Sequence, residues 1–321
     1  MKNQYETSPS VVEDMSNALK IPQNEKRLGN NIFITISKTM GLFMLSQVIT
    51  CIVIAVYFVS NIMRTTDVTG DFSFEITFGD GMIDKNLILI MLFSEIFMII
   101  IFVLYAKFKE KLNLGTLGFS KKNMFASYLV GIVGASFCMF IATLICIFTG
   151  ALTLEKAECS VFYMFLFVIG WTIQGLAEEV MCRGFLMTMI ASCYSVTVAV
   201  MANSIVFAIL HIFNPSGITV LALINLFLYG VLASLMFLYS KNIWLCAGFH
   251  TVWNMIQGNV LGIPVSGVKV PSVFSSVFNE KMSFVNGGSF GLEGGLGVTV
   301  ILVIGCTILS VLLRRRKVTK L

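Results

Sequence analysis

Apolar residues occupy the chain in eight long runs, with polar or turn-forming residues between them. The runs lie at about 40–62, 86–106, 125–150, 161–181, 194–212, 218–240, 243–261 and 291–313. A transmembrane helix needs roughly 20 apolar residues, because it rises about 1.5 Å per residue through a hydrocarbon layer about 30 Å thick. The pattern therefore predicts an all-α fold, a polytopic membrane bundle of about eight transmembrane helices.

Composition agrees with this interpretation and separates the first thirty residues from the rest. Hydrophobic residues make up 57% of the chain and charged residues 12%, and the mean hydropathy is +0.88. These values lie outside the range of soluble globular domains. Residues 1–30 contain prolines and many polar residues without apolar periodicity. We expect them to form a disordered cytoplasmic tail. Because these polar residues precede the first apolar run and no small-residue cleavage site follows it, we do not expect that run to be a cleavable signal.

Loop charges predict the orientation, because Lys and Arg accumulate on the cytoplasmic side of membrane proteins. With the N-terminus inside, sixteen basic residues fall on the inner side: Lys2, Lys20, Lys26, Arg27, Lys38, Lys107, Lys109, Lys111, Lys121, Lys122, Lys241, Arg314, Arg315, Arg316, Lys317 and Lys320. The outer loops then hold only Arg64, Lys85, Lys156, Lys269 and Lys281. We therefore expect both termini to be cytoplasmic. Anionic lipid head groups account for the net charge of +5, so membrane lipids are expected partners and nucleic acid is not.

Five ionisable residues in or beside the apolar runs need a physical reason. His211 and His250 are the only histidines of the chain, and the fourth run carries Glu178 and Glu179, followed by Arg183. A charged group at the centre of a bilayer costs about 2.5 kcal/mol or more. Such groups usually face a bundle interior, find partners there and mark a functional site. These five residues are therefore candidate site residues.

Helix geometry predicts different roles for the two adjacent glutamates. Glu179 and Arg183 are four residues apart, so they share a helix face and can form an ion pair. Glu178 lies about 100° around the helix from Glu179 and points elsewhere. We take Glu178 as the candidate general base. The alternative is a purely structural ion cluster of the three residues.

Two other runs carry polar pairs at the same four-residue spacing. Phe207 lies one turn before His211, where its ring can fix the rotamer of the imidazole. His250 lies one turn before Asn254 in the seventh run. Because these pairs accompany a glutamate pair within apolar runs, a functional site is favoured over separate core residues.

Three motifs follow one another on these runs: EExxxR at 178–183, FxxxH at 207–211 and HxxxN at 250–254. In this order they resemble the motifs of the CAAX protease and bacteriocin-processing (CPBP, or Abi) family of intramembrane proteases, which includes type II CAAX prenyl endopeptidases. The resemblance assigns three roles: water activation by Glu178 and His211, an ion pair of Glu179 with Arg183, and oxyanion stabilisation by His250 and Asn254.

The resemblance covers roughly residues 125–313 and suggests how the chain is organised. We expect a tail at 1–30, two transmembrane helices and a basic cytoplasmic loop at 31–124, the protease core at 125–313, and a basic cytoplasmic tail at 314–321. Within the core, the fourth, fifth and seventh runs are expected to form a polar cavity that opens towards the cytoplasmic leaflet.

The family resemblance implies an intramembrane endopeptidase in a bacterial cell membrane. Its substrate would be a membrane-associated peptide or protein, and its role bacteriocin maturation or self-immunity. No cofactor is favoured, because the chain lacks the HExxH pair that is the commonest zinc signature. The alternative is a zinc ion held by Glu178, His211 and His250, with water in the fourth position.

Two other classes of function compete with the protease. A non-hydrolytic membrane scaffold or sensor would keep the cavity without needing all the polar motif residues. An ion-coupled transporter would use Glu95, in the second run, together with Glu178 as protonation sites. For Glu95 a structural role is preferred, because no motif of the family lies in that run. The long loop at 262–290 is a candidate gate or docking segment.

Overall fold

The computed structural model describes residues 31–65, 84–214 and 217–318. The predicted tail at 1–30 and residues 319–321 of the predicted basic tail lie outside the described residues. The long helices are α2 (Ile32–Thr65), α3 (Lys85–Ser94), α4 (Ile96–Phe108), α5 (Met124–Phe148), α6 (Val161–Glu179), α8 (Val196–Leu210), α9 (Val220–Ser240), α10 (Trp244–Met255) and α12 (Leu296–Val318). Shorter elements are β1 (Leu152–Lys156), η2 (Val180–Met187), α7 (Thr188–Ala191), η3 (His211–Phe213), η4 (Ile256–Val260), β2 (Phe274–Phe278), η5 (Glu280–Met282), α11 (Ser283–Asn286), η6 (Gly288–Phe290) and η7 (Leu292–Gly294).

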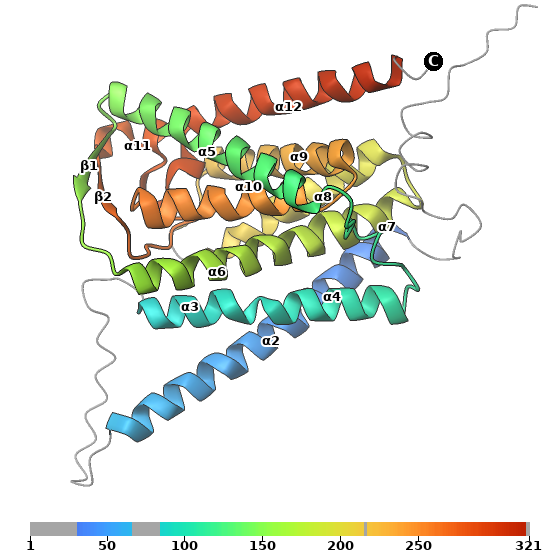
Figure 1. Cartoon of the computed structure of the whole chain (residues 1–321), viewed down its shortest axis with the longest axis horizontal. Coiled ribbons are helices and arrows are strands. Elements are labelled where there is room, and N and C mark those ends of the chain that lie inside the picture. The colour runs from blue at the N-terminus through green and yellow to red at the C-terminus, as the bar shows by residue number, and fades with distance from the viewer. Residues whose placement is uncertain (1–30, 66–83, 215–216, 319–321) are drawn as a thin grey trace, which may run out of the picture.

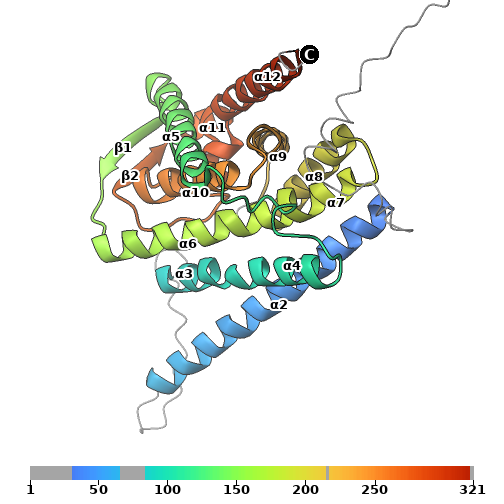
Figure 2. The same cartoon turned by 45° about the vertical axis from the view of Figure 1, so that its right-hand side comes forward.

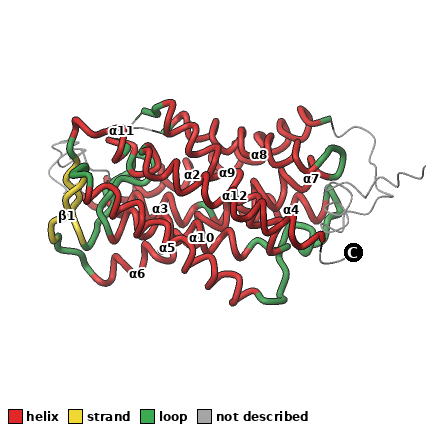
Figure 3. The backbone as a smooth tube through the Cα atoms, turned by 90° about the horizontal axis from the view of Figure 1, so that it is seen from above, coloured by secondary structure: helices red, strands yellow, loops and turns green. Residues whose placement is uncertain are grey.

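The helices form a membrane-type bundle, which confirms the predicted fold class. Seven helical segments in the described part of the chain are long and apolar enough to cross a membrane: Ile32–Ser60, Lys85–Phe108, Met124–Phe148, Val161–Ala191, Val196–Phe213, Val220–Ser240 and Leu296–Arg315. Figure 2 shows α6 between α3 and α4 on one side and α10 on the other, and α6 contacts all three. Loops and strands gather at the two ends of the bundle (Figure 3).

Of the eight predicted spans, the one at 243–261 is too short as a helix to cross a membrane. Its α-helix, α10, has only 12 residues and is followed by the π-helical segment η4. Ten of the 12 residues of α10 are buried. The apolar residues of this run therefore face other helices, since α10 is an inner element of the bundle and not a lipid-facing one.

Both described chain ends lie at the same end of the bundle, which we call the terminal end (Figure 1). The start of α2 lies there, because the backbone N–H of Ile32 donates to the hydroxyl of Tyr194, beyond α7. The loop between α9 and α10 also lies there, since Ile243 N–H donates to the carbonyl of Gly118 in the loop before α5. The seven membrane-length segments and α10 together cross the bundle eight times. Because this number is even, the chain ends at the same end at which it begins.

The opposite end, which we call the sheet end, carries a two-stranded ribbon that the sequence did not predict. Strands β1 and β2 pair antiparallel, from Leu152 with Phe278 to Lys156 with Phe274. The pairing ties the loop after α5 to the loop after α10 (Figure 1). These two strands correct the all-α expectation only locally, because they lie outside the long helices.

Close packing of α10 against α5 depends on two glycines that face each other across the helix pair. A Cβ atom on Gly131 would collide with the carbonyl oxygen of Leu245, and one on Gly248 with the carbonyl oxygen of Tyr128. Small residues allow this close approach of backbones between membrane helices, where van der Waals packing drives association. The position of α10, and of the histidine it carries, therefore depends on these glycines.

Replacement of Gly248 by Val is expected to push α10 away from α5 and to lower the thermal midpoint of unfolding in detergent and lipid. Gly41→Ala is the matched control, because no atom lies within 4 Å of a Cβ at Gly41 on α2. Alanine favours a helix over glycine by about 1 kcal/mol, so this control should leave the midpoint unchanged or raise it. Equal midpoints for wild type and Gly248→Val would contradict the packing argument.

Candidate active site

The crossing of α6 and α10 brings the first and third motifs together. A Cβ on Gly175 of α6 would lie 3.1 Å from the backbone nitrogen of Thr251 and 3.4 Å from the Cβ of His250. The two backbones therefore touch one turn before the glutamate pair. This contact places Glu178 and Glu179 beside His250, although 71 positions separate Glu179 from His250 in the chain.

Glu179 is the centre of a fully buried ionic network. Its Oε1 accepts from Arg183 Nη1 at 3.0 Å, as the four-residue spacing predicted, and from His250 Nδ1 at 3.0 Å. Arg183 Nη2 donates to the carbonyl of Gly230 at 3.2 Å, and the guanidinium lies 4.7 Å above the centre of the Phe207 ring. The side chains of Glu179 and Arg183 are 0% exposed. Because a buried charge needs a partner, this network fixes the orientation of the imidazole.

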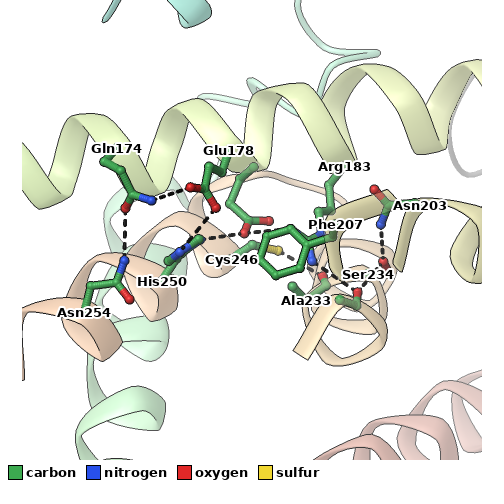
Figure 4. Close-up of polar contacts among 12 residues, drawn as sticks. Gln174, Glu178, Arg183, Asn203, Phe207, Ala233, Ser234, Cys246, His250 and Asn254 are labelled. Carbon is green, nitrogen blue, oxygen red and sulfur yellow. Dashed lines mark hydrogen bonds and ion pairs between the residues drawn. The ribbon is translucent and has the colours of Figure 1, made fainter. Parts of the chain in front are cut away.

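Glu178 points away from this ion pair and into a cavity. Its side chain is 19% exposed, in contrast to the fully buried Glu179. Its Oε1 accepts from Gln174 Nε2, and its Oε2 lies 3.8 Å from His250 Nε2 (Figure 4). Within the described structure, Oε2 of Glu178 and Oε2 of Glu179 both lack a hydrogen-bond partner. The adjacent carboxylates differ in their exposure and in the partners of Oε1, in agreement with the helix geometry.

His211 is held by its own helix at the end of α8. Its Nδ1 lies 2.8 Å from the carbonyl oxygen of Phe207, and the two rings pack with centroids 4.7 Å apart. A carbonyl oxygen only accepts, so Nδ1 carries the hydrogen and Nε2 is left as an acceptor. No hydrogen bond between His211 and Glu178 occurs in the part of the chain that the structure describes. His211 and Glu178 line the same cavity.

Gln174 connects two of the candidate residues and was not among the predicted site residues. It donates to Glu178 from Nε2 and accepts at Oε1 from Asn254 Nδ2 at 3.0 Å (Figure 4). None of the three sequence motifs includes Gln174. Its position one turn before Glu178 on the same helix was the signal that could have revealed it. Asn254 keeps a second amide hydrogen that Gln174 does not use.

One cavity of about 310 Å³ joins these side chains. Its lining includes Glu178, His211, His250 and Asn254, together with residues of α3, α9, α12 and the loop after η4, so more helices form it than the three expected. Two further carboxylates line it, Glu95 and Glu293. Arg183 and Glu179 do not line it, because they lie behind the imidazole in the buried network.

Glu293 anchors the loop after η4 to α10. Its Oε2 accepts from the backbone N–H and the hydroxyl of Ser266, at 3.0 and 2.8 Å, and its Oε1 accepts from Trp253 Nε1 at 3.3 Å. These bonds hold the beginning of the 262–290 segment against the cavity wall. We therefore assign Glu293 a structural role, and we describe this part of the loop as a fixed wall of the cavity.

The described residues do not form a metal site of the kind considered from the sequence. No group of three or more His, Cys, Asp or Glu side chains among them is arranged to hold a metal ion. Of the proposed ligands, Glu178 Oε2 and His250 Nε2 are 3.8 Å apart, a separation that two ligands of one zinc ion can have, since each ligand atom lies about 2.0–2.2 Å from the metal. The Nδ1 atoms of both histidines face protein acceptors, so Nε2 of each ring is the nitrogen available to a metal. The zinc alternative therefore stays a prediction that elemental analysis tests.

Arg183→Met should destabilise the protein by about 3 kcal/mol or more, because it leaves the Glu179 carboxylate buried without its cation. The thermal midpoint in detergent and lipid measures this loss. The double variant Glu179→Gln/Arg183→Met is the matched control, since it removes both charges and should recover part of the midpoint. The single variant Glu179→Gln completes the comparison. If the fall in midpoint of the double variant equals the sum of the falls in Arg183→Met and Glu179→Gln, the two residues are not coupled.

Comparison with known proteins agrees with the motifs. Residues 160–256 match the family model described as type II CAAX prenyl endopeptidase Rce1-like. The matched segment contains the EExxxR, FxxxH and HxxxN motifs. No curated protein and no solved structure matches the chain. The family match confirms the predicted resemblance: over this segment the chain is similar to the CAAX protease (CPBP) family of membrane proteases.

Proposed function

We propose that the protein is an intramembrane endopeptidase in which Glu178 activates a water molecule. The observation that carries the proposal is the different environment of the two adjacent glutamates. Arg183 neutralises the fully buried Glu179, and His250 donates a hydrogen bond to it, whereas the side chain of Glu178 is 19% exposed and lines the cavity. A carboxylate placed in this way can take a proton from water.

The other motif residues supply the groups that peptide hydrolysis needs. His211 presents Nε2 as an acceptor, so it can orient the water that Glu178 deprotonates. The water oxygen forms a bond to the scissile carbonyl carbon, and the carbonyl oxygen becomes an oxyanion. The second amide hydrogen of Asn254 donates to that oxyanion. A single well-placed donor of this kind contributes about 3 kcal/mol.

His250 can accept the proton that Glu178 takes from the attacking water. Its Nδ1–H donates to Glu179, since a carboxylate only accepts, and its Nε2 lies 3.8 Å from Glu178. A proton taken from water by Glu178 can pass to Nε2, and the doubly protonated ring can then donate to the oxyanion. Collapse of the tetrahedral intermediate breaks the C–N bond, and the proton goes to the leaving amine.

This proposal includes no bound metal, because the chain lacks the HExxH pair that is the commonest zinc signature. The substrate class is a membrane-associated peptide or protein, which the family match supports. Bacteriocin maturation or self-immunity in a bacterial cell membrane is the physiological role that we propose on the family resemblance alone. We propose the roles of six residues from their geometry and from the motifs: Glu178, Glu179, Arg183, His211, His250 and Asn254.

One observation favours the transporter alternative. The second span carries Glu95 at the junction of α3 and α4, and this residue lines the same cavity as Glu178. Intramembrane carboxylates are features of ion-coupled transporters. A transporter and a non-hydrolytic scaffold both predict that no peptide bond is broken, so a cleavage assay separates them from the protease.

Glu178→Gln should lower the cleavage rate at least about 100-fold, because an amide cannot act as the general base. The assay uses a library of internally quenched peptides in lipid vesicles that contain the purified protein, with products identified by mass spectrometry. Glu155→Gln, an exposed carboxylate of β1, is the matched control and should cleave like the wild type. Equal cleavage by wild type and Glu178→Gln would rule out the proposed mechanism.

Purified wild-type protein should contain less than stoichiometric zinc and should keep its cleavage activity in the presence of a chelator. Elemental analysis and a cleavage assay with and without chelator test this expectation. The opposite result has three parts. The wild type would contain about one zinc per chain, His211→Ala would lose it, and the chelator would abolish cleavage. That result would replace the metal-free mechanism by a zinc-dependent one.

A further inference from the structure

The two ends of the bundle differ in charge. At the terminal end the described residues include nine basic side chains and one acidic one: Lys38, Lys107, Lys109, Lys111, Lys121, Lys122, Lys241, Arg314, Arg315 and Glu110. At the sheet end they include four basic and four acidic ones: Lys85, Lys156, Lys269, Lys281, Asp84, Glu155, Glu158 and Glu280. Basic residues accumulate on the cytoplasmic side, so the terminal end is the cytoplasmic one.

The cavity lies in the other half of the bundle. His211 is the first residue of η3, directly after α8, and Asn214 follows η3, at the sheet end. Asn225 belongs to the first turns of α9, which begins at the same end. Ser266 and Val268 come from the loop that leads to β2. Met91, in the first half of the second span, lines the cavity and is 43% exposed.

This position differs from the expected one. The sequence led us to expect a cavity open towards the cytoplasmic leaflet, because Glu178 lies near the end of the predicted fourth span. In the structure α6 continues through η2 and α7 to Ala191, so Glu178 lies in the middle of a 31-residue helical segment. The cavity therefore extends from the middle of the bundle towards the sheet end.

The cavity wall is acidic and apolar. Among its lining residues in the described structure are three carboxylates, from Glu95, Glu178 and Glu293, and there is no Lys or Arg. Trp171, Phe207 and other apolar side chains make up much of the remaining surface. A negatively charged ligand group would meet carboxylates without a compensating cation. Such a wall favours an apolar peptide segment with basic flanks over a segment that ends in a free carboxylate.

We infer that the cavity receives its substrate from the side of the membrane opposite the cytoplasm, as an apolar peptide segment with basic flanks. This inference rests on the proposed function. Substrates of this class are exported peptides and the outward ends of membrane-protein spans. A prenylated C-terminus that is presented from the cytoplasm lies on the wrong side and carries the wrong charge.

Cysteine labelling in intact cells tests the side to which the cavity opens. The full-length chain, with Cys51, Cys159 and Cys193 replaced by Ser, carries one of three substitutions: Met91→Cys in the cavity, Lys281→Cys at the sheet end or Lys122→Cys at the terminal end. A membrane-impermeant maleimide is added before and after permeabilisation, and the ratio of the two signals removes differences in expression. Met91→Cys and Lys281→Cys should react before permeabilisation, and Lys122→Cys only afterwards. The reverse pattern would overturn the inference.

A peptide comparison tests the substrate class. Three internally quenched peptides share one apolar core and carry Lys flanks, Glu flanks, or a C-terminal farnesylated cysteine motif with a free carboxylate. The Lys-flanked peptide should be cleaved with a kcat/KM at least about tenfold above that of the Glu-flanked one, which corresponds to about 1.4 kcal/mol. Faster cleavage of the Glu-flanked or farnesylated peptide would overturn the inference.

The two proposals fail in different ways. If Glu178→Gln cleaves all three peptides like the wild type, the proposed mechanism fails, whereas the labelling ratios still decide the side of the opening. If the labelling pattern is reversed while Glu178→Gln remains inactive, the protein is still a protease of the proposed kind, and it acts on substrates from the cytoplasmic side.

Discussion

The buried ion pair of Glu179 with Arg183 is the interaction on which the rest of the site depends. Both side chains are fully buried, so each charge would be very costly without the other. The pair also binds His250 through Nδ1 and so fixes the face that the imidazole turns towards the cavity. Because Arg183 satisfies one carboxylate, its neighbour Glu178 is left for the proposed chemistry. One structural pair thus bears on two other groups, His250 and Glu178.

Helix packing sets the distances within this network. Gly175 lets α6 approach α10, and Gly131 and Gly248 let α10 approach α5, so α10 is enclosed on two sides. Two of the three motif-bearing helices are followed by a π-helical segment, η2 after α6 and η4 after α10. Such segments widen a helix locally and occur frequently at functional sites. The rigid crossing and the widened turns together make room for a cavity beside paired charges.

The sequence could predict features that depend on one helix, and it missed those that depend on how helices meet. The pairing of Glu179 with Arg183 follows from their spacing alone, as does the packing of Phe207 on His211. The contact of His250 with Glu179 and the link made by Gln174 depend on the crossing at Gly175, which spacing does not reveal. The shortness of α10 was missed because a buried inner helix and a membrane span have similar apolar composition. Loop charges indicate which end is cytoplasmic, but only the fold places the cavity towards the other end.

Isotope labelling of a single turnover tests most directly whether Glu178 acts by activating water. A peptide that the protein cleaves is mixed with excess enzyme in H₂¹⁸O, and the products and the enzyme are analysed by mass spectrometry. The account predicts that ¹⁸O enters the new carboxyl group in the first turnover and that Glu178 stays unlabelled. A first-turnover product without ¹⁸O, together with label in the Glu178 side chain, would show that this carboxylate attacks the peptide bond itself and would contradict the account.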